Sequence, residues 1–341
     1  MKEEEREISM LLKLKPEHLR PGMYVILPST WLNHPFFKSS FLLKSRQQIE
    51  KIMQSGFEEV LIDTRKGIAP PLPEKDHARH MGENGQGEDD IGPAEPESIV
   101  PEILKEAVAS GMETGKKARI LYWSSLEIMG KLFADPKAEK IAQAREGIFN
   151  VVDAVFSEDM TTHLIKLLRH DFCTYTHSVN VGMLSLLLSK SLFRGSAVHN
   201  YDELGAGFFL HDLGKARIPS DIINKPGLLT GEEWEIMKTH PEEGHKLLHE
   251  TGHLKEESRV IVMQHHEKEN GSGYPMGLAG DEIFLYARIC RLADVFDALT
   301  STRPYHEKRS AFEALNLMKN SMCFQDDLFN KFVRLFEEKG S

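Results

Sequence analysis

Residues 201–215, YDELGAGFFLHDLGK, have the pattern of an apolar helix that carries a histidine and an aspartate near its end. At helical spacing Leu204, Phe208, His211 and Asp212 fall on one face. A carboxylate on an apolar face destabilises a protein unless it is paired or coordinated. A His–Asp pair also forms ordinary structural hydrogen bonds, so this stretch alone leaves both interpretations open.

The surrounding sequence predicts a mainly α-helical chain with a small α+β domain at its start. Residues 1–66 contain a predicted strand over Met23–Leu27, a helix that ends at Gly56 and a second strand in FEEVLID. Residues 67–97 are rich in Pro, Gly and charge and predict a flexible linker. Residues 98–144 predict connecting helices, broken at Pro136. Residues 145–341 lack strand-like alternation and predict an all-α bundle.

Composition excludes several classes of protein. The 341 residues carry a net charge of −10, which argues against non-specific nucleic-acid binding. No apolar stretch approaches the roughly 20 residues needed to span a bilayer, and the charged start is not a signal peptide. Three scattered cysteines, Cys173, Cys290 and Cys323, predict free thiols and a cytoplasmic location. Of the 16 histidines, 12 lie from His163 onward, so the helical half is the place to search for a metal site.

Further histidines and an aspartate lie on or at the ends of apolar helices. His177 shares an apolar stripe with Val181, and His240 precedes Pro241 where one predicted helix gives way to the next. Each alone is more typical of a core or capping residue than of a metal ligand. Together with the first pair they make five imidazoles and two carboxylates: His177, His211, Asp212, His240, His265, His266 and Asp294.

This set of side chains favours a site for two divalent metal ions. Mixed His and Asp ligation without thiolates suits Fe, Mn or Zn. Seven ligands are too many for one tetrahedral site and about right for two metals that share a carboxylate. Two-metal sites of this kind catalyse phosphoester hydrolysis. These ligand types do not select among Fe, Mn and Zn. We expect Fe or Mn, with Zn, Ni, Co and Mg left open.

The segment from about His163 to Phe336 resembles the HD-GYP family of HD phosphohydrolases. It carries HDLGK at 211–215, HHEKENGSGYP at 265–275 and LADVFDALTSTRPY at 292–305. The first 65 or so residues are similar to a small domain of unknown function often found ahead of HD-GYP units. The resemblance implies an HD-type helical bundle that hydrolyses cyclic di-GMP to pGpG, and in some members to GMP, through a hydroxide bridging two metals.

Residue roles also follow from the resemblance. One metal would be held by His177, His211, Asp212 and Asp294. Asp212 would bridge to a second metal held by His240, His265 and His266. Asp212 and Lys215 would be catalytic, with Lys215 on the scissile phosphate. Glu267 would orient a ligand histidine.

Substrate contacts are implied by the same comparison. Tyr274 would form the guanine side of the pocket, and Arg303 would grip phosphate or base. Asp297 and His306 would complete the substrate contacts. The glycines of the GSGYP turn would let the backbone bend sharply, so that Tyr274 and Pro275 edge the pocket.

Two departures from the family pattern shape the expectations. Cys173 stands where some members carry a glutamate for a third metal, so two metals are expected. His306 stands where many members carry a lysine, which keeps open a non-catalytic cyclic-dinucleotide sensor that binds a signalling protein through the GYP loop. Hydrolysis of another cyclic dinucleotide such as cyclic GMP-AMP, an HD hydrolase acting on nucleotides or alarmones, and a homodimer are also left open.

Overall fold

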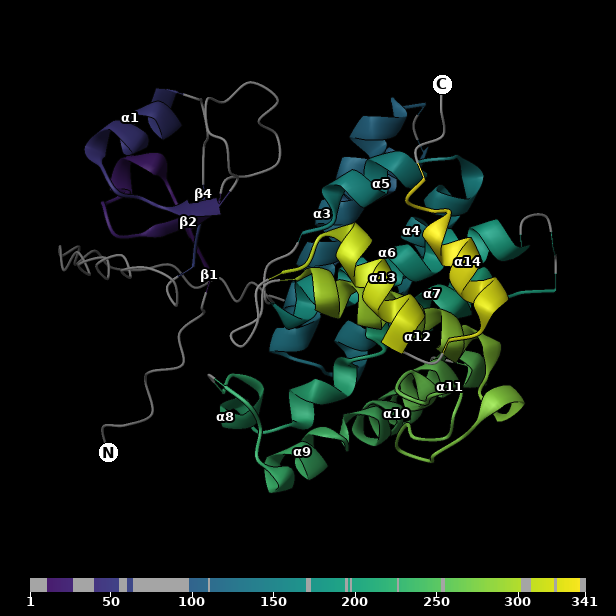
Figure 1. Cartoon of the computed structure of the whole chain (residues 1–341). Coiled ribbons are helices and arrows are strands. Elements are labelled where there is room, and N and C mark those ends of the chain that lie inside the picture. The colour runs from purple at the N-terminus through teal and green to yellow at the C-terminus, as the bar shows by residue number, and fades with distance from the viewer. Residues whose placement is uncertain are drawn as a thin grey trace, which may run out of the picture. The chain divides into compact units, whose positions relative to one another are not determined.

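The computed structural model of the chain divides into two compact units, residues 1–93 and 94–341 (Figure 1). It describes residues 11–26, 40–54, 60–63, 98–109, 111–169, 173–193, 196, 198–225, 227–252, 255–301, 308–321 and 324–337. The predicted linker over 67–97 and the helix end at Gly56 lie outside these ranges.

In its described part, the first unit is an antiparallel sheet with one α-helix and a short 3-10 turn. The strand order is β1-β4-β2-β3. The elements are β1 (Leu11–Leu14), the 3-10 turn η1 (Pro16–His18), β2 (Tyr24–Ile26), β3 (Ser40–Leu42), α1 (Arg46–Gln54) and β4 (Val60–Asp63). Ile49 and Ile52 of α1 are buried with Val25 and Ile62 of the sheet. The predicted α+β class is confirmed, although β1 and β3 had no clear sequence signal.

In the described part of the second unit, the regular secondary structure is entirely helical, apart from an isolated bridge between Asn270 and Ala279. This confirms the all-α expectation. Its helices are α2 (Glu102–Ala109), α3 (Thr114–Ala134), α4 (Ala138–Ser157), α5 (Thr161–Leu167), α6 (Thr174–Phe193), α7 (Tyr201–Leu210), α8 (Ser220–Ile223), α9 (Gly231–Met237), α10 (His240–Thr251), α11 (Glu256–Gln264), α12 (Leu285–Thr300), α13 (Ala311–Ser321) and α14 (Asp326–Val333), with 3-10 turns η2 (Leu213–Arg217) and η3 (Gly280–Glu282).

Helix α6 forms the centre of this bundle. Its sequence is apolar on all sides, and such a helix is stable only where other helices surround it. It packs against α3, α7 and α12, and Figure 1 shows it enclosed by these elements. Because α6, α7 and α12 are neighbours, the polar residues at their ends and on their facing sides come together.

The helices before residue 145 belong to the same core rather than connecting two modules. Leu121 and Tyr122 of α3 and Ile148 of α4 are buried together with residues of α6 and α7. The predicted boundary at residues 144 and 145 therefore falls inside α4. Helical periodicity showed that α3 and α4 have an apolar face, but it did not show which helices cover that face. The predicted break at Pro136 is present between α3 and α4.

None of the helices in the described ranges combines the length and the apolar character needed to span a bilayer.

Candidate metal centre

The structure brings all seven predicted ligands together in the second unit. Most of them lie where helices begin or end, next to α6, α7, α10 and α11, while Asp294 lies within α12. Their ligand atoms form two compact groups, in each of which all atoms lie within 4.8 Å of one another. One group is His177, His211 and Asp212; the other is Asp212, His240, His265 and His266. Asp212 is thus common to both groups.

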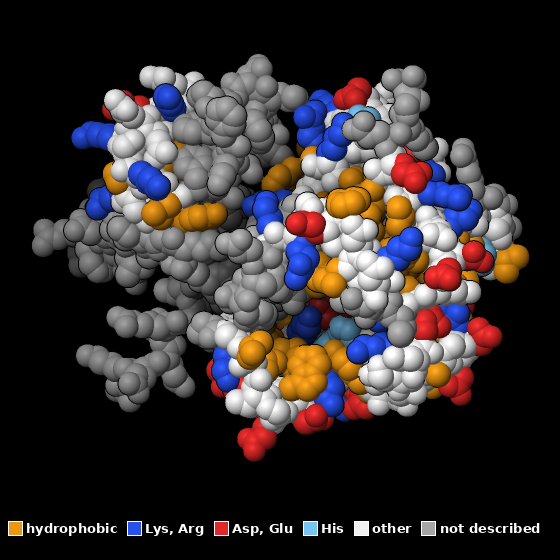
Figure 2. Space-filling view, in the orientation of Figure 1, with side chains coloured by type: hydrophobic (Ala, Val, Ile, Leu, Met, Phe, Trp, Pro, Cys, Tyr) orange, Lys and Arg blue, Asp and Glu red, His pale blue; other side chains and the backbone are white. Residues whose placement is uncertain are grey.

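Asp294 joins the two groups from the side of α12. Its Oδ1 lies 3.0 Å from Nε2 of His177, and its Oδ2 lies 3.5 Å from Nδ1 of His266. In the larger unit, Figure 2 shows histidine side chains in a hollow bordered by hydrophobic and basic side chains.

Three of the histidines are oriented by the backbone in the same way. Nδ1 of His211 donates to the carbonyl of Phe208 at 2.9 Å. Nδ1 of His240 and Nδ1 of His265 donate to the carbonyls three residues earlier, both at 2.7 Å. Because a carbonyl can only accept, Nδ1 carries the proton and Nε2 presents its lone pair to the cluster.

His177 is oriented by a carboxylate instead. Its Nδ1 lies 2.7 Å from Oδ2 of Asp297, which is only 2% exposed. The other carboxylate oxygen accepts from Nδ2 of Asn180 at 2.6 Å. Asp297 therefore lies behind His177 and away from the hollow. This position corrects the expectation that Asp297 contacts substrate: it contacts a predicted ligand, across 120 residues of sequence.

The electrostatics of the cluster favour an ionised Asp212 among neutral imidazoles. Burial alone would raise the pKa of Asp212, but Lys215 and His211 outweigh it and hold the pKa well below its usual value. The Nζ of Lys215 lies 2.6 Å from Oδ2 of Asp212. Burial lowers the pKa of His211 to about 3 and also lowers the pKa values of His240 and His266. Neutral imidazoles are the form that binds metal.

His177 differs because two carboxylates face it. Burial lowers its pKa, but Asp294 and Asp297 outweigh that effect and raise the pKa to about 9. Without another cation, this imidazole therefore holds a proton at neutral pH between the two carboxylates. A metal ion would replace that proton as the positive charge the carboxylates stabilise.

Two buried atoms test whether these residues fit a metal. Nε2 of His211 and Oδ1 of Asp212 are buried and have no hydrogen-bond partner among the described residues. Leaving such atoms unpaired costs about 1–3 kcal/mol each. Both residues belong to the ligand groups, and a divalent ion would satisfy such unpaired atoms, so the donor set fits such ions.

The Gly-Tyr-Pro loop places an aromatic side chain over the cluster. The ring of Tyr274 stacks on His266 with centroids 4.7 Å apart. The ring of Trp234 from α9 meets Tyr274 edge-on at 5.9 Å and is 45% exposed. Trp234 was not anticipated from the sequence, although an exposed tryptophan on a short helix is itself a signal. Together the two rings form an aromatic border beside the predicted ligands.

Glu267 has a different role from the one expected. Its carboxylate has no hydrogen bond or ion pair with a histidine among the described residues; Oε1 accepts from the backbone N–H groups of Met276 at 2.7 Å and Gly277 at 3.2 Å. Its Oε2 accepts from the N–H of Leu278 at 3.0 Å. The carboxylate is 1% exposed, so it fixes the chain just after Tyr274 from inside the loop.

A glycine is required where this loop crosses its own start. A Cβ added at Gly273 would lie 2.5 Å from both Cα of Glu267 and the backbone N of Lys268. Between Glu267 and Gly273, the Lys-Glu-Asn segment forms a turn in which the backbone N–H of Gly271 donates to the carbonyl of Lys268 at 2.8 Å. The HHE and GYP parts of the motif are therefore one folded unit, held by Glu267 and closed by Gly273.

We expect Glu267→Gln to lower the free energy of unfolding by about 2 kcal/mol, since a charge-assisted bond contributes about 1.5–3 kcal/mol. The amide nitrogen would face a backbone N–H where the carboxylate accepted one. Glu282→Gln is a matched control: Glu282 also accepts a backbone N–H, from Ala279 at 3.1 Å, but it is exposed. Urea unfolding of both variants measures the difference, and equal losses would contradict the role given to Glu267.

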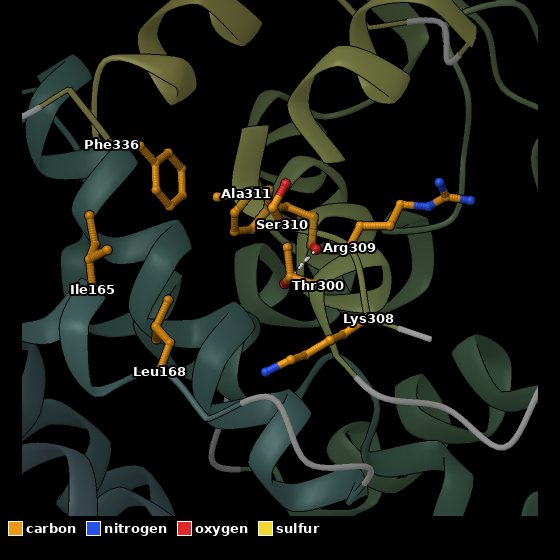
Figure 3. A pocket seen from close by; sticks show the side chains of 9 residues that line it. Ile165, Leu168, Thr300, Lys308, Arg309, Ser310, Ala311 and Phe336 are labelled. Atoms are coloured by element: carbon orange, nitrogen blue, oxygen red, sulfur yellow. Dashed lines mark hydrogen bonds between the residues drawn. The ribbon is translucent and has the colours of Figure 1, made fainter. Parts of the chain in front are cut away.

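The remaining predicted substrate contacts, Arg303 and His306, lie outside the described residues. Lys308, the next described residue, lines a pocket of about 370 Å³ with residues of α5, α12 and α13 (Figure 3). Phe296 and Thr300 of α12 face this pocket, whereas Asp297 faces α6. None of the predicted metal ligands is among its described lining residues.

Comparisons with known proteins agree with this geometry. An HD domain model matches residues 198–323, and the model of a domain of unknown function, DUF3391, matches residues 11–147. A cyclic di-GMP phosphodiesterase of Pseudomonas aeruginosa is 31% identical over 95% of this chain and 76% of its own length. A 3'3'-cGAMP-specific phosphodiesterase of Vibrio cholerae is 46% identical over 29% of this chain and 19% of its own.

A solved structure shares the fold. It is an HDG"Y"P protein from Bdellovibrio bacteriovorus, with a TM-score of 0.58 and 15% identity over 95% of this chain and 99% of that one. The HD domain match contains six of the seven predicted ligands, so most of the cluster lies within the HD domain. With the HHE…GYP unit beside it and the long match to the Pseudomonas protein, the chain belongs to the HD-GYP family.

Proposed function

We propose that this chain is a metal-dependent phosphodiesterase that hydrolyses cyclic di-GMP to the linear dinucleotide pGpG. The observation that carries the proposal is the pair of ligand groups sharing Asp212, with unpaired atoms of His211 and Asp212 buried inside them. The substrate is taken from the Pseudomonas relative, whose name states cyclic di-GMP. Hydrolysis beyond pGpG to GMP is an extension of the same chemistry.

The proposed roles divide the ligands between two ions. His177, His211 and Asp294 would hold one ion, and His240, His265 and His266 the other, with Asp212 between them. When bound, two divalent ions would activate water and stabilise charge on the phosphate oxygens. We assign Fe or Mn, two of the three metals that mixed His and Asp ligation suits.

The chain's own groups supply the rest of the site. Lys215 pairs with Asp212 and keeps 22% of its side chain exposed, so its ammonium can also contact a phosphate oxygen. Asp297 would orient His177 rather than touch substrate. The rings of Tyr274 and Trp234 offer a surface on which a guanine can stack. A protein with a net charge of −10 needs such local cations and metals to bind a doubly charged substrate.

The test is metal analysis of anaerobically purified protein together with chromatography of cyclic di-GMP digests. We expect about two metal ions per chain and formation of linear pGpG with Fe(II) or Mn(II). Folded, fully metallated wild-type protein that releases no linear product would contradict the proposal. Binding without turnover, measured by calorimetry, would instead favour a sensor that binds a partner protein through the GYP loop.

A second cyclic dinucleotide is supported by one observation. The Vibrio relative, whose name specifies 3'3'-cGAMP, matches the chain at 46% identity over the 99 aligned residues. Parallel digests of cyclic di-GMP and 3'3'-cGAMP, compared by kcat/KM, separate the two substrates. The cytoplasmic location and the homodimer stay predictions from the sequence.

A further inference from the structure

A buried chain of hydrogen bonds extends behind His177, away from the metal cluster. Asp297, which orients His177, accepts from Nδ2 of Asn180 at 2.6 Å. Asn180 lies on α6 three residues after His177 and is fully buried. The orientation of the predicted ligand therefore depends on a carboxylate whose own position depends on an amide.

The amide is fixed in turn by α3. The hydroxyl of Tyr122, which is also fully buried, donates to Oδ1 of Asn180 at 2.8 Å. That hydroxyl accepts from the backbone N–H of Arg169 at 3.0 Å, and Nδ2 of Asn180 donates to the carbonyl of Arg169 at 2.6 Å. The segment that leads into α6 is thus held by the same two side chains.

These bonds permit only one arrangement. Asn180 uses both amide hydrogens, one on Asp297 and one on Arg169, and its oxygen accepts from Tyr122. A flipped amide would turn its oxygen toward the Asp297 carboxylate and its NH2 group toward the Tyr122 hydroxyl. A polar network with every member satisfied selects a single geometry in a low-dielectric core.

We propose that Tyr122 and Asn180 are positioning residues for His177, acting through Asp297. The proposal rests on the proposed metal binding at this site. Neither residue is among the predicted metal ligands, and both are too deeply buried to reach substrate. Tyr122 lies on α3, inside the segment matched by the DUF3391 model, so the network connects that segment to the metal centre.

The test removes one hydroxyl and compares it with a matched control. Tyr122→Phe deletes the donor to Asn180. Tyr201→Phe deletes a hydroxyl that, among the described residues, bonds two backbone carbonyls, those of Phe193 at 2.7 Å and Ser196 at 2.9 Å. Mn(II) titration followed by electron paramagnetic resonance measures the affinity for each ion. The kcat and KM values for cyclic di-GMP are measured on the same proteins.

We expect Tyr122→Phe to weaken the binding of one of the two Mn(II) ions by about 10-fold. This is the lower end of the range for substitutions of residues that orient metal ligands. The kcat should fall by a similar factor while KM stays within about twofold, because the hydroxyl touches no substrate. Tyr201→Phe should leave both affinities and kcat within about twofold of wild type. Equal Mn(II) affinities and equal kcat values in the two variants would overturn the proposal.

A second variant covers the case in which Tyr122→Phe does not fold. Asn180→Asp keeps the shape and the acceptor for Tyr122 but places a carboxylate against Asp297, and we expect at least the same loss of Mn(II) affinity, about 10-fold. If Asn180→Asp binds Mn(II) as tightly as the wild type does, the proposal is also overturned. Wild type that binds two Mn(II) ions but makes no product contradicts only the substrate assignment. Wild type that binds no Mn(II) contradicts both.

Discussion

Asp212→Asn is expected to remove most of the bound metal and to lower turnover by at least about 1,000-fold. Oδ1 of Asp212 lies 3.3 Å from Nε2 of His240, and its Oδ2 lies 3.5 Å from Nε2 of both His177 and His211. An asparagine keeps the shape but removes the negative charge from both ligand groups at once. A loss of about 4 kcal/mol in transition-state stabilisation corresponds to a factor of about 1,000.

Asp202→Asn is the matched control for this substitution. Asp202 lies in the first turn of α7, the helix that ends just before Asp212; it is partly buried and outside both ligand groups. Metal analysis after anaerobic purification and the rate of pGpG formation measure both variants, and thermal unfolding without metal shows whether each is folded. Asp212→Asn protein with two metals and a rate within tenfold of wild type would contradict a shared ligand.

Much of the fold could be predicted because its signals are local. The apolar runs of α6 and α7, the capping box of Thr230 and Glu233 at the start of α9, and the break at Pro136 are each carried by a few neighbouring residues. All four strands are only three or four residues long, so a nearby turn signal decides which can be found: β2 follows Pro21 and Gly22 and β4 follows Gly56, whereas β1 and β3 follow no such signal. The packing of α3 and α4 on α6 and α7 could not be predicted, because an apolar face does not show which helices cover it.

The candidate site, too, could be predicted only in part. The cluster of predicted ligands could be found because an imidazole or a carboxylate on an apolar helix needs a buried partner. Their supporting contacts were not: Asp297 meets His177 across 120 residues, and Tyr122 meets Asn180 across 58. Glu267 was expected beside a histidine because it follows two of them, yet its carboxylate turns toward backbone N–H groups of the loop. Which way a side chain turns is decided by tertiary contacts.

His265→Ala should separate the two ligand groups. His265 belongs only to the second group, where its Nε2 lies 3.3 Å from Nε2 of His240 and 3.8 Å from Oδ1 of Asp212. Its loss leaves the group of His177, His211 and Asp212 intact. We therefore expect the metal content to fall from about two ions per chain to about one, because a two-metal clamp needs both sets of ligands. Turnover should fall by at least about 100-fold, since roughly 3 kcal/mol of transition-state stabilisation is lost.

His249→Ala provides the same substitution outside the cluster. His249 is an exposed residue near the end of α10 and belongs to neither ligand group. Metal content and pGpG formation should match wild type in this variant, so that any loss in His265→Ala is specific to the site. Two outcomes would count against the division proposed here: His265→Ala protein that keeps two ions, and protein that loses both. The second outcome would mean that the groups bind metal only together, with Asp212 and Asp294 coupling them so tightly that neither ion is held alone.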